Sequence, residues 1–136
     1  MSRSGYGDDC DDQWGLIRWR GAVASAIRGK RGQAFIREMV EALDALPEKK
    51  LIVGELRQGG EVCALGSVGV RRGLNLETID PEDPEAVAGA FGIATPLAQE
   101  IMWMNDDAYW SADPAKRWSV MRKWASDNLK EPRTAP

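Results

Sequence analysis

The sequence predicts a mainly α-helical protein, a compact bundle of about five helices in one globular domain. Three observations predict it. The chain has 136 residues, which suits a single domain. Hydrophobic residues make up 43% of it and recur at steps of three and four over long segments. Aspartate followed by proline, the order typical of a helix start, occurs at positions 80–81, 83–84 and 113–114.

The N-terminal part predicts two helices joined by a glycine-rich turn. The first, residues 14–27, places Leu16, Trp19, Val23 and Ile27 at helical spacing. The second covers residues 33–46 and ends at a proline. Because Gly29 and Gly32 lie at the break between them, we expect an αα-hairpin.

The next segment predicts one small β-hairpin. Residues 51–57 and 61–65 are short apolar runs, and Gln-Gly-Gly between them is a turn signal. A two-stranded hairpin must pack on other elements to be stable. Residues 64–72 fit a short helix, although Gly66 and Gly69 lower its helix propensity.

Residues 84–107 predict a helix-turn-helix-like unit. Its first helix runs to Phe91, Gly92 is suited to the left-handed conformation that ends a helix, and a second helix covers residues 95–105. The last helix begins at Asp113 and Pro114.

The predicted helices divide the chain into three parts. We expect a flexible acidic segment over residues 1–12, one globular domain over 13–130 and a tail over 131–136.

Composition argues against membrane proteins and against most enzymes. The chain has no apolar run long enough to span a membrane and no signal-peptide pattern, so we expect a cytoplasmic protein with Cys10 and Cys63 reduced. It contains no histidine, which removes the commonest general base and the commonest metal ligand. No catalytic or nucleotide-binding motif is present either. We expect neither an enzyme nor a bound cofactor or metal.

An acidic cluster at the N-terminus leaves one alternative open. Asp8, Asp9, Asp11 and Asp12 surround Cys10. They suit a divalent cation, a basic partner, or simply the positive end of the following helix. A metal-dependent enzyme built on this cluster is the weakest of the hypotheses.

The charges of the helix-turn-helix-like unit argue against sequence-specific DNA binding through its second helix. Its second helix, extended to residue 107, has no lysine or arginine and carries Glu100, Asp106 and Asp107. A recognition helix needs cations for base and phosphate contacts.

Basic charge is concentrated earlier in the chain. No acidic residue occurs between positions 15 and 37, and the segment contains Arg18, Arg20, Arg28, Lys30, Arg31 and Arg37. Together with backbone N–H groups at a helix start, these side chains predict an anion-binding or nucleic-acid-binding surface. The alternative is a solvated turn whose cations complement the end of the first helix.

A second candidate surface lies near the C-terminus. Four of the six tryptophans occur after position 100, and the members least suited to the core are Trp103, Asp106, Asp107, Tyr109 and Trp110. An aromatic and acidic set of this kind is typical of a protein-binding surface. It is equally typical of a closure between two helices.

Several segments together resemble a known group of proteins. They are SGYGDDCDDQW, WRGAVASAIRGKRGQAF, ALPEKKLI, EVCALG, AFGIA with LAQEIMWMNDD, and AKRWSVMRKW. The chain resembles a family of small uncharacterised proteins encoded by bacteriophages and prophages of Proteobacteria. The resemblance implies a small accessory protein of a mobile element, acting in the bacterial host cell, and it implies no catalytic residue.

Two functions follow as hypotheses. The first is a non-enzymatic phage or prophage accessory protein that binds a host or phage protein or a nucleoprotein complex, for example to inhibit a host defence such as CRISPR. The second is a nucleic-acid-binding regulator that uses the basic 18–37 surface, more than the helix-turn-helix-like segment that accompanies it. The sequence leaves the oligomeric state open.

Overall fold

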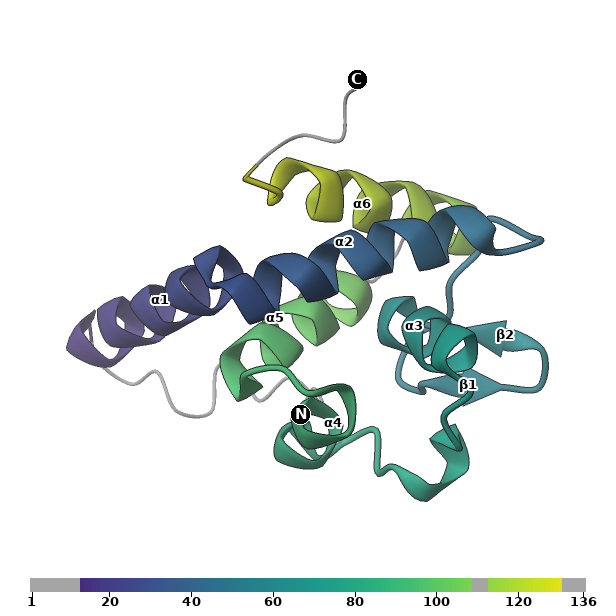
Figure 1. Cartoon of the computed structure of the whole chain (residues 1–136), viewed down its shortest axis with the longest axis horizontal. Helices are drawn as coiled ribbons and strands as arrows, with labels where there is room; N and C mark the ends of the chain where they lie inside the picture. Colours follow the sequence, from purple (N-terminus) through teal and green to yellow (C-terminus); the bar gives the residue numbers. More distant parts are fainter. Residues whose placement is uncertain (1–12, 109–112, 131–136) are drawn as a thin grey trace.

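The computed structural model describes residues 13–108 and 113–130, and helices dominate this part of the chain (Figure 1). Its regular structure consists of six α-helices, one 3₁₀ helix and one two-stranded antiparallel sheet. In chain order these are α1 (Gln13–Arg28), α2 (Lys30–Ala45), β1 (Arg57–Gln58), β2 (Glu61–Val62), α3 (Ala64–Arg72), η1 (Leu76–Thr78), α4 (Pro84–Phe91), α5 (Thr95–Asp106) and α6 (Pro114–Asp127). The predicted mainly α-helical bundle with a small β-hairpin is confirmed. The predicted N-terminal segment and tail lie outside the described residues.

The central helix of the core is α2. One of its faces collects Phe35, Ile36, Met39, Val40 and Leu43, each at most 4% exposed. Burying a side chain of this size stabilises the fold by roughly 1.5–3 kcal/mol. Both α3 and α6 pack against α2, so this stripe joins elements far apart in the sequence.

The junction between α1 and α2 is a single residue, Gly29. Its backbone is extended, with φ −67° and ψ 160°, which interrupts the helical run. The two helices meet closely, because a Cβ atom on Gly32 would lie 1.8 Å from the carbonyl oxygen of Ala26. The helices nevertheless do not fold back on each other as the expected αα-hairpin would. From Gly29, α1 and α2 extend in different directions, and α1 packs on α5 (Figure 1). An αα-hairpin that folds back on itself uses a loop of about 2–5 residues.

The β-hairpin is shorter than the sequence predicts. Only residues 57–58 and 61–62 form a ladder, with Arg57 opposite Val62. The preceding residues 51–56 direct their backbone groups to several partners: Leu51 N–H donates to the carbonyl of Pro114 and Ile52 N–H to that of Val62. Tertiary contacts thus replace the strand that the apolar run predicted.

Helix α3 contains two glycines that lower its helix propensity, and the packing of the fold requires one of them, Gly66. A Cβ atom on Gly66 would lie 1.8 Å from the carbonyl oxygen of Leu56, so only glycine lets the hairpin reach the helix. The Sγ atom of Cys63 caps α3 by accepting from the N–H of Gly66 at 3.3 Å. The buried Cys63 therefore has a structural role, and Cys10 lies outside the described residues.

The predicted helix-turn-helix-like unit is present as α4 and α5. Asp83 caps α4, Pro84 follows it, and Gly92 ends the helix with φ 71°. Of the three predicted Asp-Pro starts, those at positions 83–84 and 113–114 begin helices. At Asp80 the carboxylate instead closes a turn by accepting from the N–H of Glu82 at 3.0 Å. A helix begun at position 81 would continue through Asp83, which the following proline keeps extended.

No helix in the described part of the chain is long and apolar enough to cross a membrane.

Candidate functional site: a cationic hollow at the α1–α2 junction

Four cationic side chains line one hollow of about 300 Å³ at the junction of α1 and α2. Arg28 ends α1, Lys30 begins α2, and Arg37 lies two turns further along α2. Lys130 comes from the segment that follows α6, whose end lies beside this junction in Figure 1. We call this feature the cationic hollow; its remaining wall is Gln33.

The buried amide of Gln33 holds the three segments of the hollow together. Its Nε2 atom donates to the carbonyl of Ile27 at 2.7 Å and to that of Asn128 at 2.9 Å. Its Oε1 atom accepts from the backbone N–H of Lys130 at 2.8 Å. One side chain thereby satisfies carbonyl groups at the ends of α1 and α6 and places Lys130 beside Arg28. Each of the three bonds contributes about 1 kcal/mol.

The charges of the cationic hollow are not neutralised within the described residues. None of Arg28, Lys30, Arg37 and Lys130 forms an ion pair there, and no carboxylate lines the hollow. Other cations of this structure do have partners: Arg72 pairs with Glu38 and Arg122 with Asp44. Exposed cations outside the hollow, such as Arg57 and Lys116, also form no ion pair among the described residues, so what distinguishes the hollow is that four cations converge on it.

The six predicted basic residues separate into three groups. Arg28, Lys30 and Arg37 come together in the cationic hollow. Arg18 and Arg31 are exposed and do not line it. Arg20 is held away from it by the carboxylate of Glu100, at 2.9 Å and 3.3 Å. The pair with Arg20 also explains how a carboxylate 5% exposed is accommodated on α5.

The sequence did not identify Lys130 as part of this site. It lies 93 positions after Arg37 (130 − 37), at the last residue of the predicted domain. No local pattern signals the contact, because it depends on α6 packing against α2.

Helix α5 is buried along one side. Its residues Leu97, Ala98, Glu100, Ile101, Met102 and Asn105 are buried, since α5 packs against α1, α3, α4 and α6. A helix that enters a DNA groove must expose a polar face. That the α4–α5 unit does not read DNA stays a prediction from its charges.

Three of the predicted protein-binding residues, Trp103, Asp106 and Asp107, lie at the end of α5 in the described part of the chain. Trp103 and Asp107 are half-buried. The Oδ1 atom of Asp106 accepts from the N–H of Gly54 at 3.2 Å and from Nδ2 of Asn105 at 2.7 Å. Tyr109 and Trp110 lie outside the described residues.

Asn105, which the sequence did not single out, is the centre of this region. At 1% exposure, its Nδ2 atom donates to the carbonyl of Ile52 at 2.9 Å and its Oδ1 atom accepts from the N–H of Ala64 at 3.2 Å. Its own carbonyl accepts from Nη1 of Arg117 at 2.7 Å. Burial lowers the pKa of Arg117, and Asp106 and Asp113 partly offset that effect. These hydrogen bonds join the end of α5 to the segment before β1, to the start of α3 and to α6.

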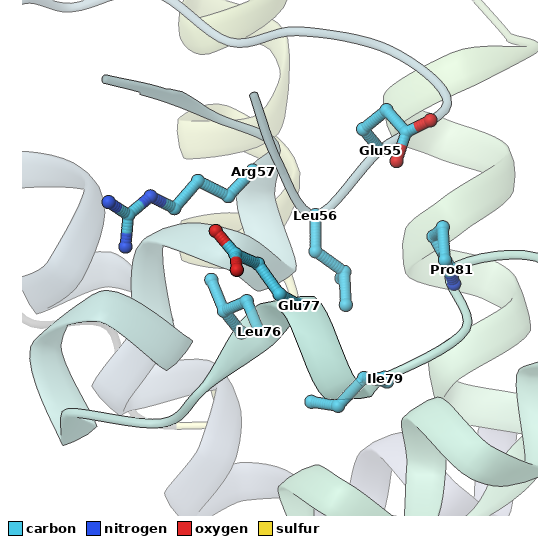
Figure 2. Close-up of a pocket in the computed structure, with 7 residues that line it drawn as sticks. All are labelled: Glu55, Leu56, Arg57, Leu76, Glu77, Ile79 and Pro81. Carbon is cyan, nitrogen blue, oxygen red and sulfur yellow. The ribbon is translucent and has the colours of Figure 1, made fainter. Parts of the chain in front are cut away.

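A hollow of about 200 Å³ between β1 and η1 has a different character. Leu56 points into it toward Ile79, while Glu55 and Arg57 extend to opposite sides and Glu77 lies between (Figure 2). Charges of both signs that diverge do not create a binding site for one ion. Among the described residues no group of three or more Cys, Asp or Glu side chains could hold a metal ion, and the predicted acidic cluster at Asp8–Asp12 lies outside them.

No protein-family profile, no curated protein and no solved structure matches the chain. The resemblance to phage and prophage proteins therefore stays a prediction, and the functional proposal depends on the geometry.

Proposed function

We propose that the protein is a non-catalytic binding protein that holds the phosphate backbone of a nucleic acid, free or within a nucleoprotein complex, in the cationic hollow. The observation that carries the proposal is the convergence of Arg28, Lys30, Arg37 and Lys130 without an ion pair among the described residues. Like charges held together repel one another, and a phosphate chain relieves this repulsion while releasing its counterions.

The surroundings of the hollow favour a chain of phosphates over a single small anion. Arg31 on α2 and Arg18 on α1 are exposed and have no ion pair within the described residues, so basic charge continues beyond the hollow. The net charge of −3 is unevenly distributed along the chain. Between positions 77 and 85 the chain carries five acidic residues and no basic one: Glu77, Asp80, Glu82, Asp83 and Glu85. An uneven distribution of this kind orients an anionic partner toward the basic end.

Fluorescence anisotropy with a labelled oligonucleotide tests the proposal. We expect binding to weaken as salt rises, with a slope of about −0.7 per phosphate contact on a single strand, or about −3 for four contacts. Lys130→Gln should weaken binding and make the slope shallower by about 0.7. Lys116→Gln is the matched control, because Lys116 is an exposed lysine near the opposite end of α6 and does not line the hollow.

Two results would refute the proposed function. One is the absence of any anisotropy change at low salt. The other is an equal loss of affinity in the two lysine variants, which would show general charge attraction without a site.

A phage or prophage accessory role is the predicted context of this activity, with a nucleoprotein complex of the host as its target. Mass spectrometry of proteins captured by the wild-type chain, compared with those captured by Lys130→Gln, tests it. Capture of the same nucleoprotein by both proteins would contradict a role for the hollow in that context.

A further inference from the structure

The acidic cluster at Asp8–Asp12 and the cationic hollow carry matching charges. The cluster, which lies outside the described residues, contains four aspartates within five positions of the sequence. The hollow brings four cations together, and none of them forms an ion pair among the described residues. The same chain thus contains a compact group of negative charge and an equal group of positive charge that attract each other.

These two groups lie at opposite ends of α1. The helix begins at Gln13, directly after the acidic cluster, and ends at Arg28, which lines the cationic hollow. At a rise of 1.5 Å per residue, the two ends of this helix are about 22 Å apart. Contact between the two groups therefore requires a chain that spans this distance, or a second molecule.

The acidic cluster is too short to gather at the hollow of its own chain. From Gln13 back to Asp8, a fully extended chain spans at most about 17 Å, and Asp12 stays next to Gln13. The four carboxylates therefore cannot surround Arg28 of the same molecule. The acidic cluster of a second copy is not limited in this way.

Two copies whose α1 helices run antiparallel make both contacts at once. The beginning of each α1 then lies beside the end of the other, so each acidic cluster meets the cationic hollow of the second copy. The side of α1 that leads to Arg28 is open to such a neighbour: Ile17 is 54% exposed, and Gly21 and Ser25 are exposed as well.

We infer that the protein forms a two-fold symmetric dimer in which the acidic cluster of each chain occupies the cationic hollow of the other. Two-fold dimers are the commonest symmetric assemblies, and each contact occurs twice in them. The second contact forms within a complex that the first already holds, which raises its effective concentration. The inference goes beyond the proposed function, because the cluster takes the place of a phosphate chain and the two ligands exclude each other.

Sedimentation equilibrium of the full-length chain tests for the dimer at about 20 mM salt, where charges are weakly screened. We expect the average mass to rise with protein concentration from that of one chain to that of two, and to fall back at about 500 mM salt. Lys130→Gln removes one cation from each of the two contacts. Because an exposed charge pair changes a binding constant about threefold, the dissociation constant should rise about tenfold. Lys116→Gln, at an exposed lysine outside the hollow, should change it less than about twofold.

Mixing two variants tests whether the cluster pairs with the hollow. One variant carries Arg28→Gln and Lys130→Gln, and the other neutralises the cluster through Asp8→Asn, Asp9→Asn, Asp11→Asn and Asp12→Asn. Each variant alone lacks one half of every contact and should remain monomeric. The mixture should form a heterodimer, because an intact cluster in one chain meets an intact hollow in the other. Circular dichroism checks that both variants are folded.

A matched control removes the same amount of acidic charge elsewhere. Four exposed glutamates outside the cluster are replaced by glutamine in one variant, and its dimer should persist: Glu55→Gln, Glu77→Gln, Glu82→Gln and Glu85→Gln. Equal weakening by these substitutions and by the four asparagines would show general charge effects and overturn the inference.

Other outcomes also decide the question. The inference is overturned by a monomer at every concentration at low salt, by a mass above that of two chains, or by a mixture that forms no heterodimer. An excess of oligo-deoxythymidine should dissociate the dimer, and a dimer that binds this strand without dissociating would overturn the shared site. A dimer that responds to all variants as expected but binds no oligonucleotide supports the inference and refutes only the proposed function.

Discussion

The same substitution should have opposite effects on stability at two glycines, Gly21 and Gly32. Both lie in helices, where alanine is favoured over glycine by up to about 1 kcal/mol. Around Gly21 an added Cβ atom would meet nothing within 4 Å. Gly21→Ala should therefore stabilise the protein by about 1 kcal/mol, which raises the melting temperature by about 4 °C in a domain of this size.

At Gly32 the added Cβ atom would lie 1.8 Å from the carbonyl oxygen of Ala26 and 3.2 Å from that of Ile27. Both neighbours are backbone atoms, so the clash is relieved only if α1 and α2 move apart. Overpacking of this kind costs about 3 kcal/mol at the upper end of its usual range. After the gain in helix propensity, Gly32→Ala should destabilise by about 2 kcal/mol and lower the melting temperature by about 8 °C.

Thermal and urea unfolding followed by circular dichroism measure both changes, and Gly21→Ala serves as the control for the general effect of alanine. Because Gly32 lies next to Gln33, the shift at the junction should also weaken the oligonucleotide binding expected of the cationic hollow. A stabilised Gly32→Ala protein would refute the close approach of the two helices, and with it the geometry of the site.

Three further expectations concern the packing that supports the fold. The hydrogen bond from Arg72 lowers the pKa of Glu38 below its ordinary value of 4.5. The ionised carboxylate therefore stabilises the protein above that pH, and this contribution is lost as the pH falls further. Glu38→Gln should flatten the acid limb of a profile of stability against pH, and an unchanged limb would contradict the role assigned to Glu38. Asn105→Asp removes the donor to the carbonyl of Ile52 from a site 1% exposed and should lower the free energy of unfolding in urea by about 2 kcal/mol; a fully stable variant would show that the bond is dispensable. Asp83→Ala removes the cap that accepts from two N–H groups of α4, and a loss of about 1 kcal/mol is expected in thermal unfolding, whereas a loss below about 0.3 kcal/mol would argue against the cap.

Helix positions were predictable where their causes are local. The Asp-Pro pair that begins α4, the similar pair before α6 and the left-handed Gly92 act within one turn of the chain. The stripe of α2 follows from the period of the helix itself. In these cases neighbouring residues contain the physical reason, so reading the sequence was sufficient.

Prediction failed where backbone groups find distant partners. The apolar run before β1 has the composition of a strand, yet Leu51 donates to the carbonyl of Pro114, a residue 63 positions away (114 − 51). Likewise the two helices of the expected αα-hairpin do not fold back on each other, because a single extended residue, Gly29, joins them and α1 packs on α5.

The basic character of the segment from Arg18 to Arg37 was evident from residue order, since charge is a local property. Which of its cations form a site was decided by tertiary packing: Glu100 on α5 engages Arg20, and the docking of α6 brings Lys130 to Arg28. The physical reason is that an electrostatic site depends on distances between side chains, and those distances are set by the packing of helices that lie far apart in the chain.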